Sequence, residues 1–468
     1  MRLPLFLSVA VLAIAVPALA QRAAPTAVSV DPAVSVARDA ALNDDVAYDI
    51  VEGLTTEVGQ RLAATEAEAR ARKWAMTKLN DLGFKNVHIE TYRMPVWVRG
   101  EEKAEIVAPY PQKLTLTALG RSAATPSNGI IAPVVYFPTI SDLIAAPAGT
   151  LKGKIAFVSH AMKATQDGSG YGAFGAARFV GPSIAASKGA AAIIIKSIGS
   201  DKGRWPHTGG TNWGPGVTPI PAAAVSVADA EQLERIFKRT TNAVMLKLML
   251  TPRSLPDAES GNVVAEVPGY DPSAGTIVIG GHLDSWDLGT GAIDDGAGVA
   301  ITTAAAKRLL TGPRPRRTIR VIWFGAEEPG GFGGEAYAKA HATEKFALAA
   351  ESDFGADAIW RFNLNLPENA KMVGDRLASA LAPLGIVRGH DVAGDGTDVG
   401  PLFKLGAPAV DFSQSGLRYF DWHHTPEDTI DKIDPEQLRQ NVAAWTAMLW
   451  IVANAPEELG PVSPLPRR

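Results

Sequence analysis

The chain gathers metal-binding residue types in one glycine-rich stretch, residues 280–298. The stretch holds one histidine and several aspartates: His282, Asp284, Asp287, Asp294 and Asp295. A short β-branched segment at 276–279 precedes it, and a segment with a helical pattern at 299–310 follows. In open α/β sheets, ligands bind at the edge where strands end and helices begin. The stretch therefore indicates half of a metal site.

Three further charged clusters follow apolar segments with the pattern of strands. They are Glu327-Glu328 after 318–324, Glu351-Ser352-Asp353 after 346–350, and His423-His424 after 408–412. Strand ends that share one edge of a sheet bring distant residues together. We therefore expect these side chains to meet those of the first stretch.

Taken singly, the clusters have purely structural explanations. Asp294 and Asp295 could cap the helix that follows them. Glu327-Glu328 could be a solvated helix start, and His423-His424 a surface pair. His282 with Asp284 is harder to explain in this way, because a metal-bound imidazole commonly donates its second N–H to a carboxylate that fixes its tautomer. The clusters together favour the metal site.

The composition limits the class of protein and the kind of metal site. A chain of 468 residues suggests two domains, and a net charge of −4 without a basic stripe argues against a nucleic-acid partner. The chain has no cysteine, which excludes disulfides and thiolate ligands. Any metal must be held by imidazole and carboxylate groups, a combination that suits zinc and, less well, manganese or cobalt.

The N-terminus has the pattern of an export signal. Arg2 precedes an apolar run at 3–19, and Ala18-Leu19-Ala20 matches the small-x-small pattern of a cleavage site. We expect a signal peptide over 1–20 and a mature periplasmic or secreted protein that begins near Gln21. The apolar run is short for a membrane span and contains two prolines, so stable membrane insertion is not expected. The following residues, up to about 40, have the composition of a poorly ordered leader.

The rest of the chain divides into an α/β pattern and an insert. Helices are expected at 65–82 and 435–455, and short strands with glycine-rich loops fill 116–245. We interpret 116–245 as a smaller domain inserted between the two parts of a larger one, 21–115 and 246–468. The long loop 203–216 in the insert has little predicted secondary structure, which makes it a candidate lid.

These residues resemble a known family. The series His282-x-Asp284, Asp294-Asp295-Gly296, Glu327-Glu328, Asp353 and His424-Thr425-x-x-Asp428 is similar to the co-catalytic di-zinc exopeptidases, the family of secreted bacterial aminopeptidases. The runs 280–287 and 351–353 most resemble its plasma glutamate carboxypeptidase branch. The insert, with Pro206-His207-Thr208-Gly209, resembles a protease-associated domain. The resemblance covers most of the mature chain and implies a three-layer, mixed-sheet α/β peptidase domain with an inserted, β-rich α/β domain.

The family pattern also implies a ligand set for two Zn²⁺ ions per chain. Asp294 would bridge the two metals. His282 and Asp353 would complete one site, and Glu328 and His424 would complete the other. This set would leave coordination positions open, as a catalytic metal site requires.

Other residues receive catalytic roles by the same resemblance. Glu327 would be the general base for a water activated between the metals, and Asp284 would orient His282. Several relatives carry a tyrosine where this chain has His423, so His423 and Tyr419 are both candidate donors to the oxyanion. Charge alone leaves three candidates for binding the substrate amine: Asp287, Asp421 and Glu427.

The resemblance implies a zinc-dependent exopeptidase that removes N-terminal residues from short peptides or splits dipeptides. Carboxypeptidase specificity and glutaminyl cyclisation with one zinc are alternatives within related enzymes. A non-catalytic, receptor-like binding protein on the same fold is a third alternative, but it predicts missing ligands, and none is missing here. The same branch of the family also suggests a homodimer.

Overall fold

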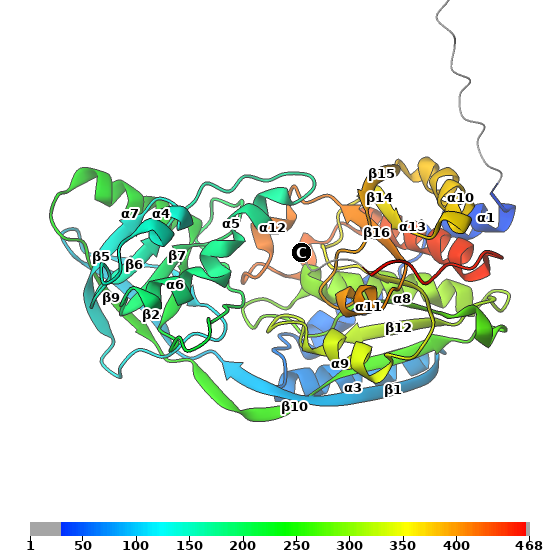
Figure 1. The fold of residues 1–468 in the computed structure, drawn as a ribbon, viewed down its shortest axis with the longest axis horizontal. Coiled ribbons are helices and arrows are strands. Elements are labelled where there is room, and N and C mark those ends of the chain that lie inside the picture. The colour runs from blue at the N-terminus through cyan, green and yellow to red at the C-terminus, as the bar shows by residue number, and fades with distance from the viewer. Residues whose placement is uncertain (1–29, 465–468) are drawn as a thin grey trace, which may run out of the picture.

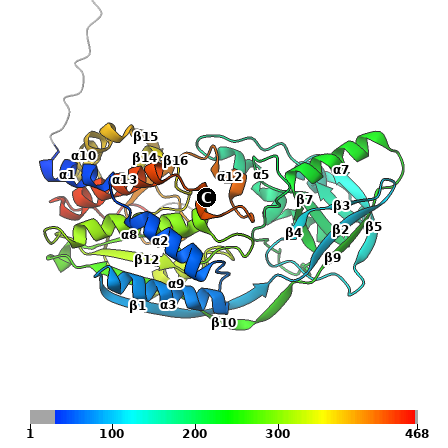
Figure 2. The ribbon, with the colours of Figure 1, turned by 180° about the vertical axis from the view of Figure 1, so that it is seen from behind.

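The protein is described from residue 30 to residue 464 by a computed structural model (Figures 1 and 2). Within these residues the chain forms two eight-stranded mixed sheets. The first sheet has the strand order β1-β10-β12-β11-β13-β16-β14-β15, and the second has the order β3-β2-β9-β5-β6-β7-β8-β4. The predicted α/β class with a mixed sheet is therefore confirmed. The predicted signal peptide, residues 1–20, lies outside the described residues. Among the described residues, no helix combines the length and hydrophobicity needed to span a membrane.

The first sheet consists of strands that precede and follow those of the second sheet along the chain. Its strands are β1 (Lys85–Val98), β10 (Arg253–Val267), β12 (Ile319–Phe324), β11 (Thr276–His282), β13 (Phe346–Glu351), β16 (Ala409–Gln414), β14 (Ile359–Asn365) and β15 (Val387–Val392). The central strands β12, β11, β13 and β16 run parallel to one another. Their carboxyl ends therefore meet at one edge, as the sequence predicted.

Helices cover both faces of the first sheet and make it a three-layer unit. Side chains alternate between the faces of a strand, so Val263 and Ala265 of β10 enter one core while Val264 enters another. The larger core lies under α1 (Pro32–Ala41), α2 (Val46–Gly53), α3 (Glu66–Asp81), α8 (Ala297–Leu310), α10 (Lys371–Leu381) and α13 (Pro435–Asn454). The smaller core lies under α9 (Phe332–Ala340) and α11 (Gly400–Lys404). Figures 1 and 2 show these layers from opposite sides.

Residues 32–41 form a helix, so the prediction of a poorly ordered leader was wrong for this part, and its beginning, residues 21–29, lies outside the described residues. Asp31 caps α1 by accepting the N–H of Ala33 at 2.9 Å, and Pro32 occupies the first turn. Val34 is buried in the larger core. Arg38 donates to the main-chain oxygen of Ala380 at 2.7 Å. These contacts fix the helix to the first unit.

The second sheet lies between two further helical layers. Its strands are β3 (Gln112–Leu114), β2 (Glu102–Ala108), β9 (Met245–Leu250), β5 (Ile130–Phe137), β6 (Ile155–Val158), β7 (Ala192–Lys196), β8 (Ala222–Val225) and β4 (Leu116–Ala118). One face packs on α7 (Val227–Arg239), and the other packs near α4 (Ile140–Ala145), α5 (Ser169–Phe179) and α6 (Gly181–Ser187). The sheet extends beyond the expected insert, 116–245, because β2 and β3 precede residue 116 and β9 continues past residue 245.

A long antiparallel ribbon joins the two units. β1 and β10 pair from Lys85 with Glu266 to Val98 with Arg253, and in Figure 1 the ribbon runs from the first unit to the second. Trp97, near the end of β1, already belongs to a core of the second unit. The chain thus enters the second unit through β1 and returns through β10, which gives the second unit the connectivity of an insert.

Candidate metal centre

The predicted ligands come from separate segments that meet at the carboxyl edge of the first sheet. The segments carry His282 at the end of β11, Asp294 just before α8, Glu328 after β12, Asp353 after β13 and His424 after α12 (Tyr419–Trp422). Because β11 lies between β12 and β13 and is parallel to both, their three ends are adjacent. The sheet order therefore explains how residues far apart in sequence form one site.

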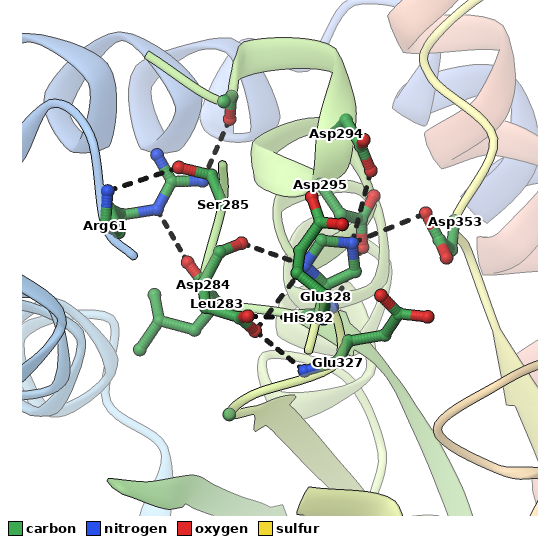
Figure 3. A network of polar contacts seen from close by, with 12 residues as sticks. Arg61, His282, Leu283, Asp284, Ser285, Asp294, Asp295, Glu327, Glu328 and Asp353 are labelled. Atoms are coloured by element: carbon green, nitrogen blue, oxygen red, sulfur yellow. Dashed lines mark hydrogen bonds and ion pairs between the residues drawn. The ribbon is translucent and has the colours of Figure 1, made fainter. Parts of the chain in front are cut away.

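His282 lies between two carboxylates (Figure 3). Its Nε2 atom is 3.2 Å from Oδ1 of Asp294 and 3.6 Å from Oδ1 of Asp353. The imidazole is almost completely buried, and Asp353 is partly open to the cavity beside it. Three groups that can each donate a lone pair thus converge on one point.

The opposite side of Asp294 faces a second group of the same kind. Nε2 of His424 is 3.1 Å from Oδ2 of Asp294 and 3.0 Å from Oε2 of Glu328. The two carboxylate oxygens of Asp294 therefore face different histidines. A carboxylate in this position can be shared between two cations.

The donor set fits divalent metal ions. Within the described part of the chain, Oε1 of Glu328 is buried without a hydrogen-bond partner, and buried Oδ2 of Asp294 faces only the ring nitrogens of His423 and His424. Buried carboxylate oxygens without partners are unfavourable, and a cation would satisfy them. Imidazole and carboxylate are the ligands that zinc takes when cysteine is absent. The residues present are therefore suited to zinc.

The electrostatics of the site show how closely its carboxylates are packed. Burial, the largest influence, raises the pKa of Glu327 well above its ordinary value, and the Asp353 carboxylate raises it further although His282 opposes them. Burial likewise raises the pKa of Glu328 against the opposing effect of His424. A cation placed among these groups would favour their charged forms.

Asp284 supports both His282 and the turn after β12. Its fully buried carboxylate accepts the main-chain N–H groups of Glu327 at 3.0 Å and Glu328 at 3.3 Å. The closest acceptor for Nδ1 of His282 is the main-chain oxygen of Asp284, at 2.8 Å, whereas the carboxylate Oδ1 is 3.7 Å away. Asp284 therefore orients His282 mainly through its backbone, and its side chain holds the glutamates.

Sequence reasoning left several supporting residues without a role. Asp295 accepts the N–H groups of His282 and Gly298, both at 3.0 Å. Arg61 is buried and donates to main-chain oxygens of the glycine-rich stretch: those of Leu283, Thr290 and Gly291. Asp295 stands in the motif and could have been assigned from it. Arg61 had no signal, because its partners are main-chain groups.

A cavity of about 340 Å³ is lined by four of the five predicted ligands, all but His282, and by the two candidate oxyanion donors, His423 and Tyr419. Nε2 of His423 is 3.5 Å from Oδ2 of Asp294. Burial, followed by the neighbouring His424, lowers the pKa of His423 well below its ordinary value, although Asp294 opposes this. A neutral imidazole can still donate one hydrogen bond. Because His423 and Tyr419 both line the cavity, either side chain can donate to a substrate bound there.

The three candidates for binding the substrate amine lie elsewhere. Asp287 accepts from Arg99 at 2.8 Å, Asp421 accepts from Ser200 at 2.8 Å, and Glu427 pairs with Lys432 at 3.2 Å. None of them lines the site cavity or the larger neighbouring cavity of about 780 Å³. The larger cavity also touches Asp353 and has a mostly acidic wall of charged residues: Asp167, Glu351, Arg361, Asp391, Asp395 and Asp411.

The second unit contributes directly to the walls of the site. Tyr171, Arg178 and Phe179 of the second unit line the site cavity, together with Gly210 from the candidate lid 203–216. In the same loop, Thr208 donates its N–H to the main-chain oxygen of His424 at 3.0 Å. The loop therefore lies against the predicted metal ligands.

Known proteins of similar sequence and structure are peptidases. The pattern of "Peptidase family M28" matches residues 262–449. Carboxypeptidase Q of Bos taurus is 34% identical over 415 residues, which are 88% of this chain and 86% of the relative. Aminopeptidase YwaD of Bacillus subtilis is 25% identical over 407 residues, which are 84% of this chain and 81% of the relative.

Solved structures agree with these sequence relatives. The structure of a peptidase M28 precursor from Shewanella amazonensis has 45% identity and a TM-score of 0.89, and the match covers 93% of this chain and 99% of that one. A zinc aminopeptidase from Bacillus subtilis shares the fold, with a TM-score of 0.63 at 20% identity over 89% of this chain and 97% of that one. The resemblance predicted from the motifs is confirmed: the chain belongs to peptidase family M28.

Proposed function

We propose that this protein is a zinc-dependent exopeptidase that binds two Zn²⁺ ions per chain and releases N-terminal residues from short peptides or splits dipeptides. One observation carries the proposal. The two oxygens of Asp294 face His282 and His424 separately, at 3.2 and 3.1 Å, in a buried site. Asp353 and Glu328 complete the two groups.

The reaction follows from the chemistry of the side chains around the cavity. Zinc bound here would lower the pKa of a water molecule and polarise the scissile carbonyl. Glu327 lines the same cavity and is next to a ligand, so its carboxylate can take the proton of the attacking water and deliver it to the leaving amine. His423 is the proposed donor to the oxyanion, with Tyr419 as the second candidate.

The charges of the cavity walls favour substrates with a free amine. Carboxylates dominate the larger cavity beside Asp353, and its arginine, Arg361, is paired with Asp391 at 3.4 Å. An acidic wall attracts an ammonium group and repels a carboxylate. Carboxypeptidase specificity is the second candidate, because the buried guanidinium of Arg178 lines the site cavity and could pair with a substrate carboxylate.

The second unit is proposed to be a protease-associated domain that limits the site to small substrates. In this proposal the insert follows the second sheet, from Glu102 to Leu250, and the loop 203–216 forms part of its lid. We also propose export through the signal pattern over 1–20, cleavage near Gln21, a periplasmic or secreted location, and a homodimer.

A panel of dipeptides tests the specificity. Free and C-blocked dipeptides should be hydrolysed, and N-blocked dipeptides should not, because blocking removes the ammonium group. Hydrolysis of N-blocked dipeptides with rejection of C-blocked ones would establish carboxypeptidase specificity instead. Failure to hydrolyse any member of the panel with zinc bound would exclude the proposed activity.

A further inference from the structure

We propose that the second unit is a structural part of one metal site, because a small group of its residues fixes His424 in the form that can bind zinc. The group consists of Asp201, His207 and Thr208, which we call the insert clamp. The inference rests on the proposed function, since it takes His424 to be a zinc ligand. It assigns the second unit a role in metal binding in addition to covering the site.

The first part of the insert clamp is an exchange of hydrogen bonds between Thr208 and His424. The N–H of Thr208 donates to the main-chain oxygen of His424 at 3.0 Å, and Nδ1 of His424 lies 3.2 Å from the main-chain oxygen of Thr208. A carbonyl oxygen only accepts, and it is closer to Nδ1 than the guanidinium of Arg178, a donor at 3.4 Å, so the contact with Thr208 places the hydrogen on Nδ1 and leaves the lone pair on Nε2. Nε2 is the atom that faces Asp294 and Glu328. The contact therefore selects the tautomer that a zinc ligand needs.

The second part fixes the residue before His424. Nδ1 of His207 is 2.8 Å from the main-chain oxygen of His423, and Nε2 of His207 is 2.7 Å from Oδ2 of Asp201. The main-chain oxygen of His423 accepts, so Nδ1 of His207 donates to it, and the Asp201 carboxylate holds the opposite side of the ring. His207 is 2% exposed and Asp201 is 7% exposed. Water therefore competes little with these bonds.

The backbone of His424 needs this support. Its φ of 62° lies in the left-handed region, which is unfavourable for a residue with a side chain. Such conformations persist when the surrounding structure determines them. Thr208 binds the main-chain oxygen of His424 itself, and His207 binds the one before it. The insert clamp thus holds both the conformation and the imidazole of the ligand.

Zinc binding in the full-length enzyme tests the inference. Wild type, His207→Ala, His207→Asn and Ser200→Ala are equilibrated with a graded zinc–chelator buffer, and bound zinc is counted. Ser200→Ala is the matched control, because the Ser200 hydroxyl bonds Asp421 across the same interface without contacting His423 or His424. Wild type and the control should hold two zinc ions. His207→Ala should bind one of them about 10- to 100-fold more weakly and the other normally.

Two further variants identify the weakened site. His207→Asn keeps an amide donor close to the position of Nδ1 and should fall between wild type and His207→Ala. Glu328→Gln weakens the same zinc by a different route, so adding His207→Ala to it should not weaken the remaining zinc. If His207→Ala does not fold, Asp201→Asn supplies the test, with an expected loss of about 10-fold at one site.

The results separate the two levels of the proposal. Folded His207→Ala that holds both ions as tightly as wild type would overturn the inference alone. Equal weakening of both ions would also overturn it, because it would show a general loss of structure. Wild-type protein that binds no zinc would overturn the proposed function, and the inference with it.

Discussion

The carboxylate of Asp284 accepts the main-chain N–H of Glu327 at 3.0 Å. The residue that orients His282 thereby also fixes the turn that carries the proposed general base. Ala326, which precedes Glu327, has a φ of 56°, so this turn adopts an unfavourable conformation that the contact stabilises. Asp284 therefore holds the predicted metal ligand His282 through its main-chain oxygen and the proposed base Glu327 through its carboxylate.

Replacing Asp284 by asparagine should weaken zinc binding about 10- to 100-fold, because one carboxylate oxygen becomes an amide donor that faces a main-chain N–H. Zinc retention against a chelator measures this. Asp271→Asn is the control, since Asp271 precedes the far end of β11 and bonds Ser273 and Arg316. Equal zinc retention in the two variants would contradict the role of Asp284.

Glu327→Gln should keep both zinc ions and lower kcat by about 100- to 10,000-fold, because the amide cannot accept the proton of the attacking water. Steady-state kinetics with a free dipeptide, together with a zinc count, gives both quantities. Unchanged turnover would rule out Glu327 as the base. Loss of a zinc ion would instead make Glu327 a ligand.

His423→Phe should keep both zinc ions and lower kcat about 100- to 1000-fold with little change in KM, because the oxyanion loses its donor. Tyr419→Phe should have a smaller effect. The opposite order of effects would assign the oxyanion to Tyr419. Because His423 also lies 3.5 Å from Asp294, loss of zinc in His423→Phe would identify it as a metal ligand.

Glu68 should make the stability of the metal-free protein depend on pH. Burial raises its pKa from 4.5 to about 7, although Arg72 and Ser260 oppose the change. A raised pKa in the folded state means that the folded protein binds the proton more tightly. The contribution of Glu68 is therefore fully present below about pH 4.5 and is lost as the pH rises through about 7.

Thermal unfolding of wild type and Glu68→Gln across this range tests the effect. The Tm of wild type relative to the variant should fall as the pH rises from about 4.5 to 7. The glutamine variant has no proton to lose at this position, so it provides the reference. A constant difference in Tm would show that Glu68 does not titrate in this window.

Side-chain identity made the first sheet and the ligand set predictable. His282 and Asp294 stand in a glycine-rich turn after a β-branched strand, and the other ligands follow strands of the same pattern. Parallel strands with helical connections bring such ends together, as β11, β12 and β13 do. α1 also had a readable signal, because Asp31 and Pro32 form a helix start that the surrounding Ala- and Val-rich composition obscured.

The contacts between the units could not be predicted in this way. Thr208 faces His424 through a main-chain carbonyl, which every residue possesses, across a separation of 216 positions. The extent of the second sheet was also hidden, because β2 and β9 have ordinary strand patterns and only their pairing shows that they belong to the second sheet. The first feature depends on how the units dock, the second on pairing between strands far apart in sequence, and neither on local sequence.

Titration of zinc into the metal-free enzyme tests the central claim most directly. Bound zinc and hydrolysis of a free dipeptide are measured on the same samples. We expect no turnover without metal and full activity when two zinc ions are bound per chain. Full turnover in the chelated enzyme, or full activity at one zinc ion per chain, would contradict this claim.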